Sequence, residues 1–255
     1  MYVIALSHGK GGVAKTTTVI SLGTALTEHM KRVLLIDLDP QAGMSPLLGL
    51  GMPDPQWSIA QVFYDSASIG RVIRHTDVLG LDIVPSSHEL SMAEQYLPLH
   101  RNYQYQLRRI LREVEPIYDF VLLDCPPFLG AVTLNAIVAA HMLIIPTLPE
   151  MLSIAGMQHM REWVNHAKID NNPYLIYRIL ITMYDKRNRS HIEITEKLRQ
   201  RLGEELFETV IGVDNKVRES QILGKPVLVH AKKSRASLQY RALAQEVLNY
   251  VERKP

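Results

Sequence analysis

A glycine-rich stretch near the N-terminus carries two lysines around one turn, with the sequence Gly-Lys-Gly-Gly-Val-Ala-Lys-Thr-Thr over residues 9–17. An apolar run at residues 2–6 precedes it, and apolar side chains at helical spacing follow it over residues 16–26. A turn between a strand and a helix N-terminus directs backbone N–H groups and the positive end of the helix dipole toward an anion. The stretch is therefore typical of a phosphate-binding loop.

The residues of this loop fit the general phosphate-loop pattern with one departure. That pattern has a glycine, four residues, a second glycine, a lysine and a serine or threonine; Gly9, Lys15 and Thr16 match it. Ala14 stands where the second glycine is expected. Because positive φ is costly for a residue with a Cβ, we expect a negative φ at Ala14, as for a residue entering a helix. Lys15 is expected to reach the β and γ phosphates, and the Thr16 hydroxyl to bind Mg²⁺.

Two acidic motifs follow apolar runs elsewhere in the chain. Asp37-Leu-Asp39-Pro-Gln comes directly after residues 33–36, and Asp124-Cys-Pro-Pro comes after residues 120–123. An aspartate at the end of a strand beside a phosphate loop can hold Mg²⁺ through water, and a second aspartate can position an attacking water. Each aspartate alone could instead be a strand-end turn or a helix cap. The three motifs together favour a nucleoside triphosphate hydrolase.

The elements that must position these residues are alternating strands and helices. Strands are predicted at residues 2–6, 33–36, 81–84, 120–123, 142–145 and 176–183, and helices at 16–29, 58–64, 101–114, 131–138, 153–168, 190–202 and 236–252. Continuous apolar strands of this kind are buried on both faces. The sequence therefore predicts an α/β fold: a mostly parallel twisted sheet with helices on both faces and ligands at the carboxyl ends of the strands.

Composition is ordinary for a globular protein with a sizeable core. The 255 residues are 47% hydrophobic and 21% charged, with a net charge of +2 and no linker or low-complexity run, so we expect one domain over residues 1–255. No apolar stretch is long enough to cross a bilayer and the N-terminus lacks a signal-peptide pattern, which favours a cytoplasmic protein. The single cysteine, Cys125, excludes an intrachain disulfide framework and is expected to be a small buried residue.

The motifs resemble those of the ParA/MinD family of P-loop ATPases. Lys10 before the glycines, with Lys15 and Thr16, is similar to the deviant Walker A loop of that family, and the two aspartate motifs match its companion motifs. The resemblance continues through residues 182–185, 217–220 and 224–226 to the terminal helix around Tyr240. It covers essentially the whole chain and is greatest for the ParA/Soj chromosome and plasmid partition branch.

The resemblance implies roles for individual residues. Lys10 would reach across an ATP-sandwiched homodimer to the partner's nucleotide, offsetting transition-state charge as an arginine finger does. Asp39 would orient the hydrolytic water, Asp124 would support Mg²⁺, and Asp37 would be structural or order the metal's surroundings. The implied catalytic residues are Lys10, Lys15 and Asp39, and the implied metal-binding residues are Thr16, Asp39 and Asp124. The implied nucleotide-binding residues are Gly9, Lys10, Gly11, Gly12, Val13, Ala14, Lys15, Thr16, Thr17, Met183 and Tyr184, with residues 211–214 closing the adenine pocket.

Relatives in this family use membranes, iron-sulfur clusters or DNA, and the chain contains features that discriminate among them. Leu238, Ala242, Gln245 and residues 248–251 are expected to pack a terminal helix on the domain, which weakens a MinD-like membrane anchor. A cluster-bridging iron protein needs two cysteines per subunit, and this chain has one. No membrane anchor is apparent.

Basic residues concentrate late in the chain. Residues 186–201 and 214–235 each contain six basic and two acidic side chains. They could simply be a solvated surface. The resemblance favours binding of non-specific DNA through phosphate contacts, which places the protein on the nucleoid. The candidate DNA-binding residues are Lys186, Arg187, Arg189, Lys216, Arg218, Lys232 and Arg235.

The resemblance thus implies a Mg²⁺-dependent ATPase that hydrolyses ATP to ADP and phosphate. It would dimerise with ATP, bind DNA, and drive chromosome or plasmid partition with a ParB-like adaptor protein. Three alternatives remain open from the residues alone: an ATPase that positions a protein cargo such as a carboxysome or chemoreceptor cluster, a MinD-like membrane-associated ATPase, and a small-molecule enzyme on the same fold.

Overall fold

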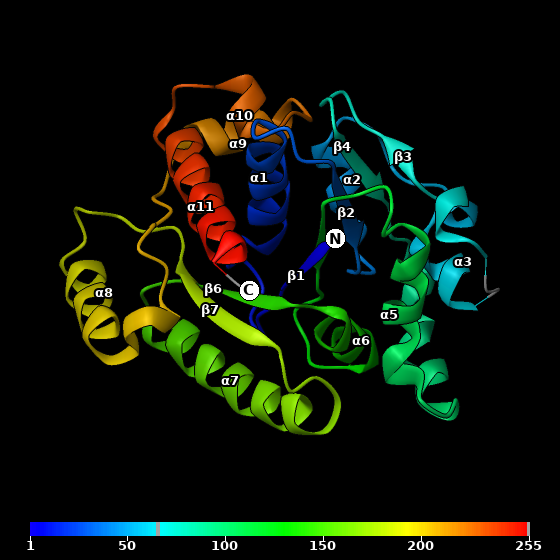
Figure 1. Ribbon diagram of the computed structural model, residues 1–255. Helices are drawn as coiled ribbons and strands as arrows, with labels where there is room; N and C mark the ends of the chain where they lie inside the picture. Colours follow the sequence, from blue (N-terminus) through cyan, green and yellow to red (C-terminus); the bar gives the residue numbers. More distant parts are fainter. Residues whose placement is uncertain (65–66, 254–255) are drawn as a thin grey trace.

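The structure is a computed structural model that describes residues 1–64 and 67–253, and its strands form one seven-stranded sheet (Figure 1). The order across the sheet is β3-β4-β2-β5-β1-β6-β7. The strands are β1 (Tyr2–Leu6), β2 (Val33–Asp37), β3 (Arg74–His75), β4 (Leu81–Val84), β5 (Phe120–Asp124), β6 (Met142–Thr147) and β7 (Ile176–Ile181). Every neighbouring pair is parallel except β3 with β4, so the predicted mostly parallel sheet is confirmed.

Alternate side chains of each strand enter two separate cores, one on each face of the sheet. In β1, Ile4 and Leu6 join one hydrophobic cluster while Val3 and Ala5 join the other. This is the period-two alternation of a strand, with both faces apolar because helices cover both. The continuous apolar runs in the sequence have this origin.

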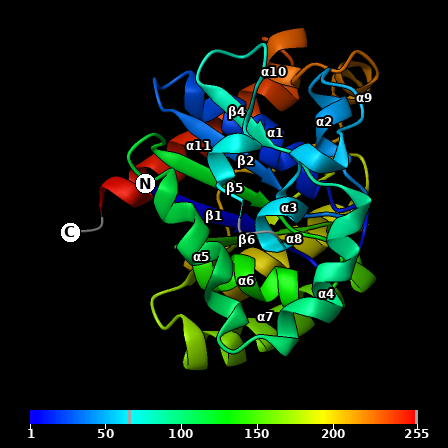
Figure 2. The same cartoon turned by 90° about the vertical axis from the view of Figure 1, so that its right-hand side faces the viewer.

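Helices form a layer on each side of the sheet. The α-helices are α1 (Lys15–Thr27), α2 (Met44–Leu47), α3 (Ile59–Tyr64), α4 (Ala93–Tyr96), α5 (Gln106–Ile110), α6 (Ala131–Ala139), α7 (Met151–Asn171), α8 (Arg189–Leu202), α9 (Asn215–Ile222), α10 (Val227–His230) and α11 (Arg235–Glu252). Figures 1 and 2 show α1, α10 and α11 on one side of the sheet and α6 and α7 on the other. Residues of α1 and α11 share one core cluster, and residues of α3, α5, α6 and α7 share the other.

One predicted helix needs correction, and the short helices α2, α4, α9 and α10 were not predicted. The expected helix at 101–114 is broken into 3₁₀ turns at Tyr103–Tyr105 and Leu111–Glu113 around the short α5. Asn135 of α6 accepts a hydrogen bond from the Leu107 N–H at 3.0 Å, so a tertiary contact anchors this segment. Helices α9 and α10 were not predicted, although Asp214 accepts from the Lys216 N–H at 3.0 Å as an N-cap and was a readable signal for α9.

The terminal helix α11 packs on the domain as expected, but with a different face. Leu238 is 57% exposed, and Ala242 and Gln245 are also exposed. The buried stripe contains Tyr240 and Leu243, and the Tyr240 hydroxyl lies 3.2 Å from Thr18 Oγ1 on α1. The first half of the predicted stripe is therefore wrong, whereas Leu248 is buried as predicted and Tyr250 and Val251 pack against the same cluster.

Sheet register brings the predicted acidic residues to one edge. Leu6, at the end of β1, is paired with Asp124 of β5, which is in turn paired with Asp37 of β2. Both aspartates are the last residues of their strands rather than the first residues after them. The phosphate-loop stretch begins at this same edge.

Candidate functional site

The phosphate-loop stretch connects β1 to α1, as predicted, but its backbone differs from the expectation. Ala14 is the N-cap of α1 with φ 65° and ψ 32°, so the expected negative φ is wrong. The left-handed conformation costs roughly 1–2 kcal/mol for a residue with a Cβ. Contacts on both sides hold it: Thr182 Oγ1 donates to the Val13 carbonyl at 3.1 Å, and the Thr18 N–H donates to the Ala14 carbonyl at 2.9 Å. The surroundings therefore impose a backbone that alanine disfavours.

The two lysines of the loop lie in different surroundings. Lys15 is the first residue of α1 and is 7% exposed. The Lys10 side chain is 38% exposed, and its Nζ lies 3.6 Å from Oε2 of Glu150, the residue just before α7. One lysine is thus held within the fold at a helix N-terminus, and the other lies at the surface.

Thr16 and Asp124 meet beside the loop. Thr16 Oγ1 donates to Asp124 Oδ2 at 2.5 Å, while the buried Asp124 Oδ1 accepts no hydrogen bond from the described residues. Burial raises the pKa of Asp124 to about 7, against the lowering effects of the Thr16 hydrogen bond and the Lys15 charge. A hydroxyl and a carboxylate oxygen without a partner are the hard oxygen donors that Mg²⁺ prefers, so these residues fit a magnesium ion.

The two aspartates of the Asp37-Leu-Asp39 motif have different surroundings. Asp37 is buried, and its carboxylate accepts from the Asp39 N–H at 3.0 Å and from the Met44 N–H at 3.1 Å. Burial, followed by the charge of Asp124, raises the pKa of Asp37 well above its ordinary value. Asp39 is half-buried and accepts from the Gln41 N–H at 3.0 Å. Asp37 therefore shapes the turn after β2, and Asp39 presents the more accessible carboxylate.

One residue of this edge was missed by the sequence analysis. His8 is fully buried between the loop and α7: its Nδ1 accepts from the Lys10 N–H at 2.9 Å, and its Nε2 lies 3.1 Å from the Ser153 carbonyl oxygen. No motif marks it, because its partner on α7 lies 145 residues away in the chain.

The predicted adenine segments lie side by side. The Tyr184 N–H donates to the Ile211 carbonyl at 3.0 Å, and the Val213 N–H donates to the Tyr184 carbonyl at 3.0 Å. Strand β7 ends at Ile181, two residues before its predicted end, and Met183 has a φ of 50°. The chain turns at this point rather than continuing the strand.

A cavity of about 550 Å³ lies next to these segments and is large enough for a small ligand. Residues 185–187 and 213–216 contribute to its walls, whereas Met183 and Tyr184 do not. The lining residues are Asp185, Lys186, Arg187, Val213, Asp214, Asn215, Lys216, Glu219 and Arg235. Four of the DNA-binding candidates therefore share one hollow with the predicted adenine region.

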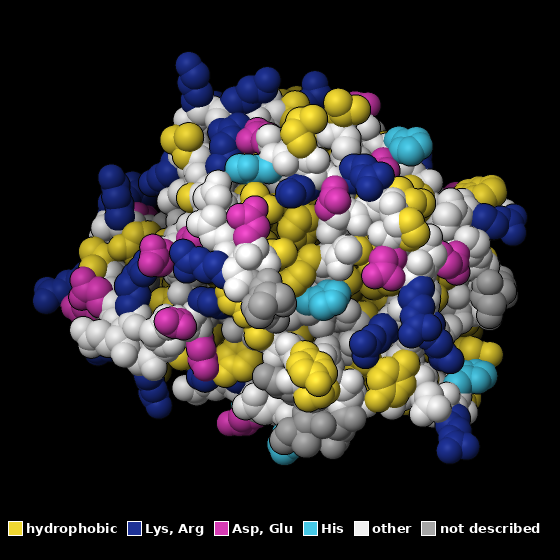
Figure 3. Space-filling model, in the orientation of Figure 1, with side chains coloured by type: hydrophobic (Ala, Val, Ile, Leu, Met, Phe, Trp, Pro, Cys, Tyr) yellow, Lys and Arg dark blue, Asp and Glu magenta, His cyan; other side chains and the backbone are white. Residues whose placement is uncertain are grey.

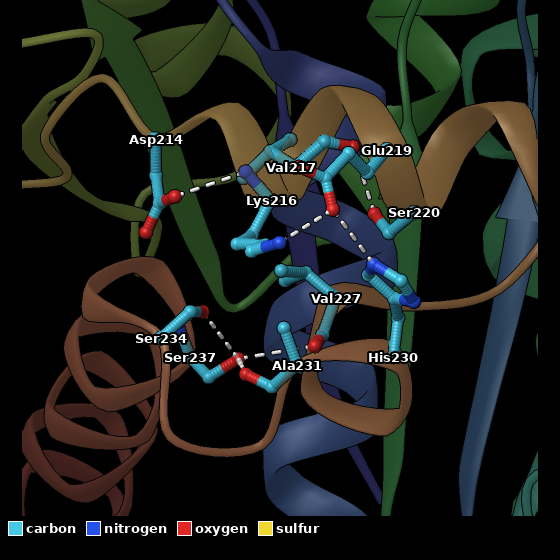
Figure 4. Close-up of polar contacts among 10 residues, drawn as sticks. All are labelled: Asp214, Lys216, Val217, Glu219, Ser220, Val227, His230, Ala231, Ser234 and Ser237. Atoms are coloured by element: carbon cyan, nitrogen blue, oxygen red, sulfur yellow. Dashed lines mark hydrogen bonds and ion pairs between the residues drawn. The ribbon is translucent and has the colours of Figure 1, made fainter.

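Several of the DNA-binding candidates have partners within the chain. Their contacts are Arg187 with Asp185 at 2.9 Å, Arg189 with Glu193 at 2.9 Å, Lys216 with Glu219 at 2.7 Å, and Arg235 with the Val213 carbonyl. Figure 4 shows the Glu219 carboxylate between Lys216 and His230, whose Nε2 is 3.3 Å away. The charge counted over residues 186–201 and 214–235 therefore overestimates the charge that is free to contact DNA. The first range begins just after Asp185, which pairs with Arg187, and neither count includes ion pairs between near neighbours.

The other three candidates, Lys186, Arg218 and Lys232, are exposed and form no ion pair among residues 1–64 and 67–253. In Figure 3, lysines and arginines project along the edge where Figure 1 places α8, α10 and α11. The two basic stretches of the sequence therefore carry fewer uncompensated charges than their composition suggests.

Over the part of the chain that the structure describes, none of the helices has the length and apolar character needed to span a membrane. Cys125 is buried as predicted, and burial raises the pKa of its thiol.

Comparison with known proteins identifies relatives over nearly the full chain. A family described as an AAA domain matches residues 1–177. The chromosome partitioning protein ParA of Caulobacter vibrioides is 35% identical, over 97% of this chain and 94% of that protein. The sporulation initiation inhibitor protein Soj of Bacillus subtilis is 33% identical, over 96% of this chain and 97% of that protein.

Solved structures show the same fold. Cobyrinic acid a,c-diamide synthase from Mycobacterium smegmatis, with bound ADP and magnesium, superimposes with a TM-score of 0.82 at 30% identity, covering 100% of this chain and 97% of the other. The chain therefore belongs to the AAA-domain family and, within it, to the ParA/Soj-type ATPases of the ParA/MinD group with a deviant Walker A loop.

Proposed function

We propose that this chain is a Mg²⁺-dependent ATPase whose single domain forms an ATP-sandwich homodimer, binds non-specific DNA in that state, and drives chromosome or plasmid partition with a ParB-like adaptor. The observation that carries the proposal is the contrast between the two loop lysines. Lys15 is buried at a helix N-terminus, whereas the Lys10 side chain is partly exposed and forms an ion pair with the half-exposed Glu150. A lysine in that position is free to serve a nucleotide held by a second copy.

Nucleotide binding rests on the loop and the Thr16–Asp124 pair. The backbone of residues 9–17 and Lys15 would hold the phosphates. Thr16 can donate its proton to Asp124 and still offer an oxygen lone pair to a cation, so their hydrogen bond can persist with metal bound. When bound, Mg²⁺ would neutralise charge on the phosphates. Asp39, with the accessible carboxylate, would orient the water that attacks the γ-phosphate.

Dimerisation is supported by apolar side chains beside Lys10. Met151 and Leu152, in the first turn of α7 directly after Glu150, are 74% and 76% exposed. Exposed apolar groups gathered at one edge mark interaction surfaces. A second copy placed over the nucleotide would cover them while Lys10 crossed to the partner's phosphates.

DNA binding is supported by the basic edge of α8 to α11. The exposed Lys186, Arg218 and Lys232 would contact phosphates, so binding would be independent of sequence and weakened by salt. The protein would lie on the nucleoid while it holds ATP and leave it after hydrolysis. The ParB-like adaptor would set the time of release by stimulating turnover.

One alternative has an observation in its favour. The similarity to a cobyrinic acid a,c-diamide synthase suggests a small-molecule enzyme that uses the same nucleotide site. Against a thiol-dependent reaction of that kind, the single cysteine, Cys125, is buried, and burial raises the pKa of its thiol. Positioning of a protein cargo would use the same nucleotide site as DNA partition, so these residues do not separate the two roles.

The proposal is tested by light scattering and retardation of random duplex DNA with ATP, ADP or no nucleotide. Wild type should become dimeric and retard DNA at low salt only with ATP, and Lys10→Ala should do neither. Asp39→Ala is the matched comparison, because it should retain the ATP-bound dimer and lose turnover. A Lys10→Ala dimer with ATP would refute the role of Lys10, and turnover that requires a small-molecule acceptor would favour the synthase alternative.

A further inference from the structure

A buried histidine joins the phosphate loop to the first turn of α7. His8 Nδ1 accepts from the Lys10 N–H at 2.9 Å, and His8 Nε2, as the neutral Nε2–H tautomer, donates to the Ser153 carbonyl at 3.1 Å. Ser153 is itself buried, and its Oγ accepts from the Leu148 N–H at 3.0 Å, just after β6. The imidazole is therefore one link of a chain of hydrogen bonds from the Lys10 backbone to the start of α7.

The imidazole of His8 is tightly packed, which limits its movement. A Cβ added at Gly156 of α7 would come within 2.8 Å of His8 Cε1, so the helix backbone lies directly against the ring. On the surface, the Lys10–Glu150 ion pair is a second tie between the same two segments. The loop and the first turn of α7 are thus joined both in the interior and at the surface.

Only one protonation state of the ring satisfies both contacts. The Nδ1 atom must accept from a backbone N–H, which a doubly protonated imidazolium cannot do. Burial lowers the pKa of His8, and the charges of Lys15 and Lys10 lower it further. The ring is held neutral in the tautomer that the hydrogen bonds require.

We propose that His8 is a positioning residue that fixes the backbone of Lys10 relative to the first turn of α7, so that the Lys10 side chain is presented to a second copy of this chain. The inference rests on the sandwich dimer proposed above. Neither the nucleotide nor the metal touches His8 in this scheme; the histidine acts through Lys10. The same link would transmit to Lys10 any displacement of the exposed Met151–Leu152 turn.

The test compares two substitutions that differ in hydrogen bonding. Glutamine at position 8 can both accept and donate, whereas leucine can do neither. In His8→Leu, the protein concentration for half-maximal ATP-dependent dimerisation should rise about tenfold, as expected for the loss of buried hydrogen bonds. Binding of fluorescent ATP to the monomer, which depends on Lys15, should change by less than about twofold because it lies outside this link. His8→Gln should restore most of the dimerisation.

Matched variants separate positioning from general destabilisation. His29→Gln, at an exposed histidine just beyond α1, should behave as wild type. Gly156→Ala keeps His8 but displaces the ring, so it should weaken dimerisation in the same direction as His8→Leu. If His8→Leu does not fold, Gly156→Ala and His8→Gln still decide the matter. Equal dimerisation of wild type, His8→Leu and Gly156→Ala would overturn the proposal.

A nucleotide-free measurement distinguishes failure of this inference from failure of the proposed function. Hydrogen–deuterium exchange should be faster in His8→Leu than in wild type for peptides covering residues 7–13 and 148–156, and restored in His8→Gln. If wild type never dimerises with ATP but these differences appear, the sandwich dimer is wrong and the link stands. If wild type dimerises but exchange at both segments is unchanged in His8→Leu, the positioning role is wrong.

Discussion

At the scale of single residues, the loop combines a strained backbone with buried charge. Ala14 has positive φ, and Asp124 has a buried oxygen without a partner among the described residues. Both features are costly without a ligand, and both lie beside Lys15 at the start of α1. The site is therefore organised for an anion and a cation before either one is bound.

Replacing Ala14 with glycine should stabilise the nucleotide-free protein. Glycine adopts positive φ without the penalty of roughly 1–2 kcal/mol, and part of that gain is offset by greater freedom of the unfolded chain. We expect Ala14→Gly to raise the free energy of unfolding by about 0.5–1 kcal/mol in urea denaturation. Ala242→Gly, at an exposed position inside α11, is the control and should lower it by about as much. Destabilisation by Ala14→Gly would show that Ala14 is unstrained.

Asp124 should make the stability of the metal-free protein depend on pH. Its pKa is about 7 in the fold and near 4 when unfolded, so the folded state binds the extra proton between those values. Stability from this group is therefore present at low pH and is lost as pH rises from about 4 to about 7.

The measurement is urea denaturation without Mg²⁺ at several pH values. Asp124→Asn removes this titration. The free energy of unfolding of Asp124→Asn minus that of wild type should therefore increase by on the order of 2 kcal/mol between pH 5 and pH 8. Asp77→Asn, at an exposed aspartate, should follow wild type throughout. A constant difference between Asp124→Asn and wild type would contradict the raised pKa.

At the scale of elements, α7 and the phosphate loop form one unit. His8 joins them in the interior, and Lys10 with Glu150 joins them at the surface. An exposed ion pair of this kind is weak, so it can orient Lys10 without preventing it from leaving.

Removing the charge of Glu150 should therefore release Lys10. In Glu150→Gln, the ATP-dependent dimer should be favoured by about two- to fivefold, the range expected for a partly exposed ion pair. Sedimentation equilibrium across a protein concentration series measures this shift. Glu162→Gln, at an exposed site in the same helix, should leave the equilibrium unchanged. Weaker dimerisation in Glu150→Gln would mean that the pair itself supports the interface.

At the scale of the whole molecule, net charge is less informative than its pairing. The chain has a net charge of only +2, and much of its basic edge is neutralised by neighbouring acids. Arg218 on α9 and Lys232 just after α10 are exposed and have no acidic ion-pair partner among the described residues. We therefore expect DNA phosphates to contact Arg218 and Lys232.

Substitution of the unpaired cations should reduce both DNA affinity and its salt dependence. The Arg218→Ala and Lys232→Ala double variant should lower the slope of log affinity against log salt by about two, roughly one for each lost phosphate contact. The Arg187→Ala and Arg189→Ala double variant is the matched control, since aspartate and glutamate already hold those charges. A larger effect in the control would show that the pairs open on DNA. Retardation assays at several salt concentrations with ATP provide the slopes.

Much of the architecture could be predicted because its signals are local. Apolar runs such as residues 33–36 and 120–123 mark buried parallel strands, and the phosphate loop and strand-end aspartates have characteristic spacing. The buried face of α11 was misassigned, because several stripes of that helix are apolar and only contact with α1 selects the one with Tyr240. The break in the helix expected at 101–114 has the same kind of cause, a contact from Asn135.

The sequence by itself determined the fold class, the phosphate loop and the carboxylates at the sheet edge, since short-range patterns encode each of them. Only the tertiary structure decided the conformation of Ala14, the link from His8 to α7, and which basic side chains remain unpaired. The link from His8 to α7 depends on residues far apart in the chain, since 145 residues separate His8 from Ser153. The basic side chains pair mostly with near neighbours, and only the side-chain geometry shows which of them do so. Local propensity disfavours positive φ at Ala14, and the contacts of Val13 with Thr182 and of Ala14 with Thr18 impose it.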